Sequence, residues 1–454
     1  MEKTPSPKPL PVIKGHWLLK NALELKAGMI EFYEKYTKLE GEVFLVDTLK
    51  EKLVILAHPD YAKHILQDNN KNYTKSYAYD ILRLFLGNGL LTSEGDFWLK
   101  QRRLAQPAFH REKLQKLTEN IIHATNEFVL TLEEKAEKGI AINIAHDFNG
   151  LALDIVSSAL FTSDISGNMD KVRTSMDVAN EFAIGKIFEL IPWPLWVPLA
   201  SHLKFKKACQ ELDEVITTII TERRKNPGNY QDLLSMLMET RDEDTGETMS
   251  DTQLRDEAMT IFLAGHETTA IALSWFFYLM SKYPECATKI RAEVEDICGD
   301  GPLKPKHLPH LKYTRMAIDE SLRLYPPAWA IGRKAISDDV IGGYSIPKGA
   351  NMIVLPYELH RHPDFWINPN DFNPERFAQE KAKEMHKFAY FPFGGGPRQC
   401  IGNNFALMEM QVIIATLLQK FDFKRTSNKE PEKEQLVTLR MKNGLEVTVH
   451  KLNH

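Results

Sequence analysis

The chain has 454 residues, of which 43% are hydrophobic, and a formal net charge of -4. This composition supports a large core and lacks the basic excess that is typical of nucleic-acid-binding proteins, so no nucleic-acid partner is expected. A chain of this length could hold about three domains, but no low-complexity linker or internal repeat divides it. We therefore expect one domain over residues 1–454.

The start of the chain and its cysteines indicate where the protein works. Residues 1–15 form a proline-rich arm without a basic segment followed by an apolar run, so neither a secretory signal nor a membrane anchor is predicted. Cys209, Cys286, Cys298 and Cys400 show no disulfide-scaffold, zinc or c-type haem spacing. We expect a cytoplasmic protein and a monomer.

In chain order, residues 42–57 hold two β-rich runs around a polar turn and predict a hairpin. Helical periodicity then dominates until residues 439–450, which predict a second hairpin with Asn443-Gly444 as its turn. The fold class is therefore mainly α with small β sheets. Helices are predicted over 109–132, 151–161, 203–224, 251–283, 286–298, 311–324 and 403–421.

The helix over 251–283 is unusually long. Ser250 and Gln253 have the spacing of a capping box, and Pro284 ends the helix, which at 1.5 Å per residue spans roughly 50 Å. Its middle is apolar apart from one serine and the polar residues 266–269, which would be costly at bilayer depth. We expect a buried helix through a large core.

The stretch "FPFGGGPRQCIG", residues 391–402, presents Cys400 on a glycine-rich loop. Three glycines can aim backbone N–H groups at a sulfur, and the N-terminus of the following helix favours a thiolate, so the loop is suited to a metal ligand. The absence of Lys-Ser or Lys-Thr after the glycines excludes a phosphate cradle. A buried, inert cysteine and a cysteine nucleophile with a histidine partner remain open from these residues alone.

This loop resembles the haem-binding signature Phe-x-x-Gly-x-Arg-x-Cys-x-Gly of the cytochrome P-450 family. The fixed positions are Phe393, Gly396, Arg398, Cys400 and Gly402. Three more motifs stand in family order, "WLKQR", "AGHETT" and "ESLR" with a later "PERF", so the resemblance covers nearly the whole chain. The implied fold is a single α-rich haem domain. The sequences of its motifs resemble those of bacterial fatty-acid hydroxylases and microsomal members more than those of camphor-type enzymes.

The resemblance implies haem b, iron protoporphyrin IX, as the cofactor. Cys400 would be its axial thiolate, the metal ligand, with Phe393 packed beside the sulfur. Small residues such as Ala264 and Gly265 would let the long helix pass close over the haem face. Arginines and an indole N–H would hold the propionates, although a solvated surface role stays open for Arg333. The implied cofactor-binding residues are Trp98, Arg102, Ala264, Arg333, Phe393, Arg398, Cys400 and Gly402.

The same resemblance implies that Glu267 and Thr268 are catalytic, an acid and an alcohol that relay protons during oxygen activation. The alternative is a satisfied polar pair in the core. We expect His266 to support the helix rather than bind iron. Glu320 and Arg323 share a helix face, and with Arg376 of "PERF" the resemblance implies a buried structural network behind the haem.

An apolar substrate pocket should lie over the haem. Arg83 could bind a carboxylate there but is better explained as a solvated charge. Residues 191–200, "IPWPLWVPLA", are interpreted as packing at a helix junction, and a lid that touches a membrane is the alternative. The predicted pocket residues are Tyr77, Leu82, Phe85, Leu86, Ile261, Phe262, Ala328, Trp329, Ala330 and Ile331, with Ile184, Ile187 and Phe188 from a lid.

The resemblance implies a monooxygenase that uses O2 and two electrons to hydroxylate or O-dealkylate a small hydrophobic substrate, such as a fatty acid, terpenoid or methyl ether. No reductase follows the haem part, so a separate ferredoxin or flavodoxin with an NAD(P)H reductase is expected. Lys100, Arg103, Lys113 and Lys116 could steer it, or form a solvated helix face. The alternatives are a haem-thiolate isomerase or peroxide-driven peroxygenase and a non-catalytic haem sensor.

Overall fold

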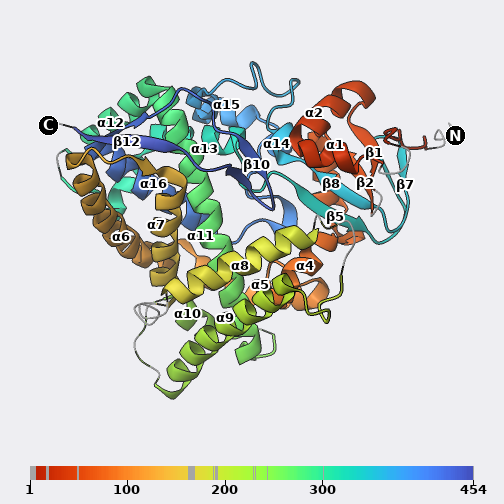
Figure 1. Ribbon diagram of the computed structural model, residues 1–454, viewed down its shortest axis with the longest axis horizontal. Coiled ribbons are helices and arrows are strands. Elements are labelled where there is room, and N and C mark those ends of the chain that lie inside the picture. The colour runs from red at the N-terminus through yellow and green to blue at the C-terminus, as the bar shows by residue number, and fades with distance from the viewer. Residues whose placement is uncertain are drawn as a thin grey trace.

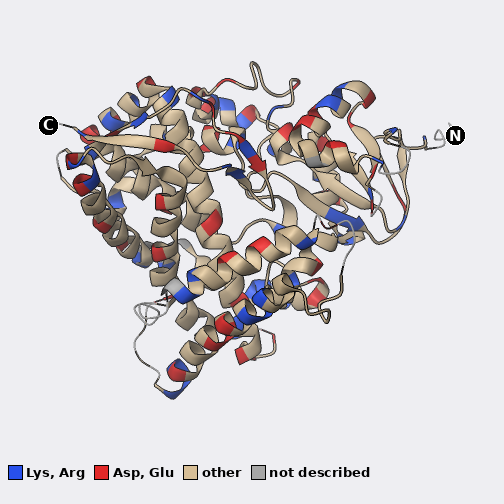
Figure 2. Ribbon diagram, in the orientation of Figure 1, with Lys and Arg blue, Asp and Glu red and all other residues tan. Residues whose placement is uncertain are grey.

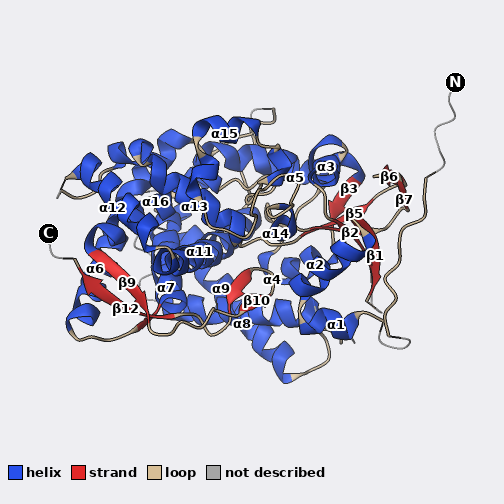
Figure 3. Cartoon of the chain, turned by 90° about the horizontal axis from the view of Figure 1, so that it is seen from above, coloured by secondary structure: helices blue, strands red, loops and turns tan. Residues whose placement is uncertain are grey.

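A computed structural model describes residues 7–16, 20–48, 51–161, 169–187, 189, 193–226, 228, 230, 232–242, 244–299 and 301–452. Helices α6, α7, α11, α12 and α16 gather at the side of the molecule near the C-terminus, and the largest sheet lies with α1 and α2 at the opposite side near the N-terminus (Figures 1 and 3). The described helices are α1 (Ala22–Ala27), α2 (Met29–Glu40), α3 (Pro59–Lys63), α4 (Tyr77–Leu86), α5 (Gly95–Ala105), α6 (Arg111–Glu137), α7 (Ile144–Phe161), α8 (Met169–Ile187), α9 (Ala200–Lys225), α10 (Leu233–Glu239), α11 (Asp251–Lys282), α12 (Pro284–Cys298), α13 (Lys312–Leu324), α14 (Pro356–Leu359), α15 (Gln379–Glu384) and α16 (Asn403–Lys420).

All the helices predicted from periodicity are present, with ends that differ by a few residues. The largest differences are α7, which begins at Ile144 rather than at 151, and α6, which runs on to Glu137. Helix α8 was not predicted, because charged residues recur along it and leave only a weak apolar stripe.

The helix α11 runs through the core, as expected. The Ser250 hydroxyl accepts the Gln253 backbone N–H (3.2 Å), which caps the first turn, and the helix packs along α7. Figure 2 shows charged residues on the outer helices and tan along much of α11. No helix in the described part of the chain is long and apolar enough to cross a membrane.

The largest sheet has the strand order β1-β2-β8-β5-β3, and β2 and β8 are its parallel pair. It contains the predicted N-terminal hairpin, with Val43 opposite Leu56. The strands are β1 (Val43–Asp47), β2 (Lys52–Leu56), β3 (Tyr73–Lys75), β4 (Ile142–Asn143), β5 (Ile331–Ala335), β6 (Asp339–Ile341), β7 (Tyr344–Ile346), β8 (Asn351–Val354), β9 (Phe421–Arg425), β10 (Lys433–Gln435), β11 (Leu439–Met441) and β12 (Glu446–Lys451).

The predicted C-terminal hairpin is wrong. Asn443 and Gly444 do turn the chain with positive φ (64° and 69°), but β11 pairs with β10, whereas β12 pairs with β9 and β4. The turn chemistry was therefore interpreted correctly, and the strands beside it were assigned to one sheet instead of two. β12 is the middle strand of a three-stranded sheet with β4 and β9, and β11 forms a two-stranded sheet with β10.

Candidate functional site

Cys400 lies at the end of the glycine loop, directly before α16. Its backbone N–H donates to Phe393 O (2.9 Å), which closes the loop, and Gly396 adopts a positive φ of 68° where a Cβ would overlap Leu66 O. The side chain of Cys400 remains exposed. A single thiol is thus held in place by backbone contacts and left open on one side.

The protein alone does not favour the thiolate, which differs from the expectation. Although one side of the sulfur is open, the surrounding loop and α16 shield it from water enough to raise the pKa of Cys400, and the Gly402 backbone N–H and the Arg102 guanidinium lower that pKa by less. A bound metal cation reverses this balance, because a coordinating thiol is deprotonated. The loop therefore fits a metal ligand better than a free nucleophile.

A group of cations lies beside this loop. The Arg398 guanidinium stacks 3.7 Å from the centre of the Trp98 ring, and its Nη1 donates to Ser93 O (2.8 Å). Burial lowers the pKa of Arg398 to about 10, and Glu94 partly restores it. Arg102 donates from Nη1 to Gln399 O (3.0 Å). The predicted propionate ligands therefore lie around the same loop.

Lys75 joins this group and was missed from the sequence. It stands directly opposite Arg333 in the pairing of β3 with β5, and like charges in that position repel one another. Burial, followed by Arg398 and Arg333, lowers the pKa of Lys75 well below its usual range. Only the pairing of the two strands reveals it. This crowding of cations around one acid, Glu94, fits a cofactor that carries two carboxylates.

One face of α11 is left uncovered in the middle of the helix. Ala264 is exposed and Ile261 and Thr268 are half-buried, although the neighbouring turns are buried. These residues share a face, and the Thr268 hydroxyl donates to Ala264 O (2.6 Å). Gly265 differs from expectation: a Cβ there would lie 2.8 Å from Val156 Cγ2, so this glycine permits close packing of α11 on α7.

Glu267 is buried, but it borders a cleft on another side of the same helix. Its Oε1 accepts the Thr438 hydroxyl (2.6 Å) and Arg440 Nε (2.9 Å), and its Oε2 accepts Asn180 Nδ2 (2.8 Å). A cleft of about 180 Å³ beside it is lined by Asn149, Ser274 and Arg440 among others. The carboxylate thus contacts Asn180 of α8, Thr438 just before β11 and Arg440 of β11, and it also borders the solvent-accessible cleft.

His266 has no position from which to bind iron. It is buried, its Nε2 lies 2.8 Å from Asn149 Oδ1, and burial lowers its pKa to about 4, so the ring is neutral. Another buried acid on this side was missed: Glu409 of α16 accepts the Thr269 hydroxyl (3.3 Å), and burial raises its pKa to about 8. Its one weak sequence signal was a lone Glu on the apolar face of α16.

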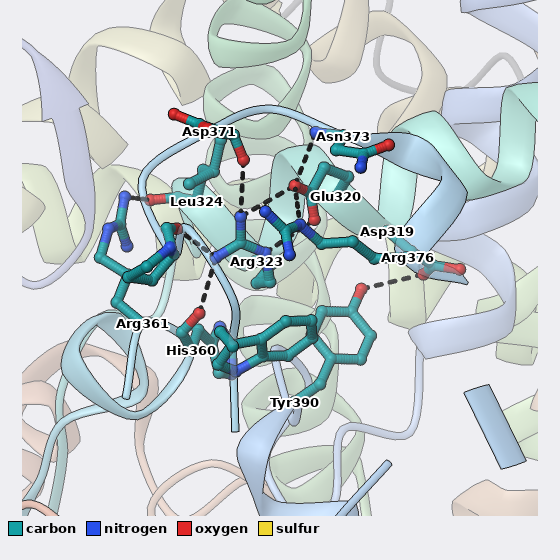
Figure 4. Close-up of polar contacts among 12 residues, drawn as sticks. Asp319, Glu320, Arg323, Leu324, His360, Arg361, Asp371, Asn373, Arg376 and Tyr390 are labelled. Carbon is teal, nitrogen blue, oxygen red and sulfur yellow. Dashed lines mark hydrogen bonds and ion pairs between the residues drawn. The ribbon is translucent and has the colours of Figure 1, made fainter. Parts of the chain in front are cut away.

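Glu320, Arg323 and Arg376 form the expected buried network, shown in Figure 4. The Glu320 carboxylate accepts Arg323 Nε (2.7 Å) and Nη2 (2.8 Å) and Arg376 Nε (3.2 Å). The remaining N–H groups of Arg323 donate to the backbone oxygens of His360, Pro369 and Asp371. Each charge is therefore paired and hydrogen-bonded, as burial requires.

His360 links this network to the cysteine loop and was not predicted. Its backbone oxygen accepts Arg323 Nη1 (2.8 Å), and its ring Nε2 accepts the Phe391 N–H (3.0 Å) at the start of that loop. Burial lowers the pKa of His360 to about 3, which keeps the ring neutral and able to accept. The charge network therefore fixes the backbone from which Cys400 is presented.

Most predicted pocket residues lie on α4, on the uncovered face of α11 or near the start of β5, but Phe262 and Trp329 do not fit. Phe262 packs on Phe161 of α7, with ring centres 6.3 Å apart, and Trp329 Nε1 donates to Leu436 O (2.9 Å) in a separate apolar cluster. Ile184 and Ile187 are half-buried on α8, and Phe188 is outside the described residues. Leu82, Phe85, Leu86 and Ile331 are buried, Tyr77 and Ala330 are half-buried, and Ala328 is exposed.

Two predicted surface features need correction. The segment before α9 is not packed inside, because Trp193 and Trp196 are 51% and 78% exposed. Lys100 is paired with Glu247, and Arg103 with Asp242 and Asp244, so acids of the segment between α10 and α11 neutralise both. Arg83, by contrast, is 40% exposed and pairs with the exposed Asp80 (2.8 Å), in agreement with the solvated charge expected there.

Comparison with known proteins settles the family. Residues 5–449 match the family described as cytochrome P-450. The chain belongs to the cytochrome P-450 family. This cytochrome P-450 is therefore a haem-thiolate monooxygenase whose cofactor is haem b.

Proteins similar to this cytochrome P-450 occur in plants, bacteria and Homo sapiens. It is 31% identical over 452 residues to Protein LUTEIN DEFICIENT 5, chloroplastic, of Arabidopsis thaliana, covering 95% of this chain and 75% of that protein. It is 32% identical over 367 residues to cyclooctatin synthase of Streptomyces melanosporofaciens, covering 79% and 78%. The crystal structure of the cytochrome P450DA heme domain is similar, with a TM-score of 0.91, 26% identity and 99% of both chains covered.

Proposed function

We propose that this cytochrome P-450 hydroxylates, or oxidatively O-dealkylates, a small hydrophobic molecule, using O2 and two electrons from a separate protein. Haem supplies the oxygen activation when it is bound. Cys400 holds the iron, and Trp98, Arg102, Arg333 and Arg398, with Lys75 in addition, hold the propionates. Phe393 shields the sulfur.

The observation that carries the proposal is the placement of two adjacent polar residues on α11. Thr268 lies with Ala264 on the uncovered face, whereas Glu267 borders a cleft of about 180 Å³. A carboxylate supplied with protons from that cleft can recharge a hydroxyl at the reaction face, which is the arrangement that stepwise proton delivery needs. An isomerase that does not reduce O2 has no need of this relay.

The apolar residues of the uncovered face and of α4 support a hydrophobic substrate. Two similar proteins are named cyclooctatin synthase and cyclooctat-9-en-7-ol 5-monooxygenase. Among the expected substrate classes, we propose to test terpenoids first. None of the four cysteines forms a disulfide, which fits a reducing compartment such as the cytoplasm.

The electron donor proposed here is an acidic ferredoxin or flavodoxin with its NAD(P)H reductase. Lys113 and Lys116 are exposed on the first turns of α6. Helix α6 packs against α16, the helix that follows Cys400, so these two lysines lie on the cysteine side of the protein. The other two predicted cations are neutralised by acids of the same chain.

The variant Thr268→Ala tests the relay, with Thr269→Ala as its matched control. Terpenoids that convert the ferric haem from low to high spin are first selected as substrates. We expect Thr268→Ala to bind them unchanged, while the share of electrons that reaches product falls at least about tenfold and hydrogen peroxide rises. Full coupling in this variant would show that the hydroxyl is dispensable.

A further inference from the structure

The segment 87–94, which connects α4 to α5, lies directly on α11 and is held there by two buried acids. The Asn88 N–H donates to Asp256 Oδ2 (2.7 Å), and the Leu90 N–H donates to Glu257 Oε2 (3.0 Å). Glu257 is fully buried, and its other oxygen accepts Gln253 Nε2 (2.7 Å). The cytochrome P-450 motifs assign no role to either acid.

Two glycines make this contact possible. Gly87 has a positive φ of 67°, and a Cβ there would overlap the Asp256 carboxylate. A Cβ at Gly89 would overlap the Thr260 hydroxyl. The backbone of the segment can therefore approach α11 only because these side chains are absent.

The same segment is held from its other side by Lys75. Its ammonium donates to the carbonyl oxygens of Leu90 (3.4 Å) and Leu91, while Arg398 Nη1 donates to Ser93 O (2.8 Å). Lys75 and Arg398, two of the cations proposed to bind the propionates, thus donate hydrogen bonds to carbonyl oxygens of the segment. Asp256 and Glu257 accept hydrogen bonds from its N–H groups. One short piece of backbone joins the propionate site to α11.

We propose that Glu257 is a positioning residue for the haem: by fixing segment 88–91 from α11, it holds the Lys75 ammonium where the propionates bind. Binding of haem and ordering of this segment are then coupled. The inference rests on the proposed placement of the propionates. The hold of Glu257 and Lys75 on residues 88–91, called the clamp below, is tested separately in the haem-free protein.

The charges around Glu257 define how the clamp responds to pH. Lys75 of β3 and the adjacent Asp256 act on it directly, and burial raises its pKa to about 7. Around Lys75 stand Arg83 of α4, Glu94 before α5, Arg333 of β5 and Arg398. Arg255 of α11 joins Asp256 (2.9 Å) to Asp213 of α9. The ionised carboxylate accepts the Leu90 N–H and attracts Lys75, so ionisation should tighten the clamp.

The test measures transfer of haemin from the holoprotein to excess apomyoglobin, together with exchange of the Leu90 amide in the haem-free protein. We expect Glu257→Gln and Lys75→Met each to speed haemin loss about tenfold, since the first removes the negative charge that accepts the Leu90 N–H and attracts Lys75, and the second removes the ammonium that donates to the segment. In the double variant, the rate of haemin loss should rise by less than the product of the two single effects, because the two residues hold the same segment. Asp251→Asn, an exposed acid on the same helix, is the matched control and should change nothing.

The pH profile separates positioning from a general loss of structure. Within one unit either side of pH 7, wild-type haemin loss should slow as pH rises, and Glu257→Gln should lack this step. Leu90 exchange should quicken in Glu257→Gln without haem. Unchanged haemin loss in both single variants, or fully multiplicative effects, would overturn the proposal. Absence of oxygenase turnover would refute the proposed function and leave these readouts untouched.

Discussion

The molecule contains two buried glutamate–arginine sites that use the same chemistry in opposite settings. Glu320 and Arg323 are wholly buried, and Arg376 and backbone carbonyls satisfy the rest of the site. Glu267 is also buried, but its partner Arg440 is 35% exposed and a cleft adjoins both. A closed pair can only hold the backbone in place, whereas a pair with access to solvent can exchange protons. If the proposed relay operates, accessibility to solvent, and not the ion pair, distinguishes the catalytic glutamate from the structural one.

The largest effect is expected for Glu320→Gln. Removing this charge leaves Arg323 buried without its counter-charge, so the free energy of unfolding should fall by about 3–5 kcal/mol. Urea unfolding measures it. Glu375→Gln, an exposed acid in the same "PERF" motif, is the control and should change stability by less than about 0.5 kcal/mol. A loss of that smaller size for Glu320→Gln would show that the network is not structural.

The variant Glu267→Gln should give the opposite pattern. The amide oxygen can still accept from Thr438 and Arg440, so the fold should remain, while coupled turnover falls on the order of a hundredfold because the proton is lost. The solvent deuterium isotope effect on turnover should increase. Wild-type coupling in this variant would place proton delivery elsewhere, and the comparison of the two glutamates would fail.

The smallest effect concerns the outer surface. Replacing Lys113 and Lys116 together by Glu should slow reduction by an acidic ferredoxin several-fold at low salt, and the difference should shrink as the ionic strength rises. Stopped-flow reduction measures it. The same change at Lys100 should matter less, because Glu247 already neutralises that lysine. Equal rates for wild type and the Lys113/Lys116 double variant would remove this surface from electron transfer.

What the sequence predicted depends on how local the physical signal is. The helix α11 and the pairing of Glu320 with Arg323 follow from patterns along one stretch of chain, and these predictions hold in the structure. The partners of Glu267 come from α8 and from β11, and Lys75 meets Arg333 only after β3 pairs with β5. The same limit explains the wrong C-terminal hairpin: a turn can be recognised locally, but the strand's partner cannot.

The proposed chemistry of this protein depends on a bond between the Cys400 sulfur and the haem iron. The direct test is the absorption spectrum of the reduced carbon monoxide complex of the wild-type protein and of Cys400→Ser. We expect a strongly red-shifted Soret band for the wild type and its loss in the variant, with haem held weakly at most. The same red-shifted band in both proteins would contradict thiolate ligation by Cys400.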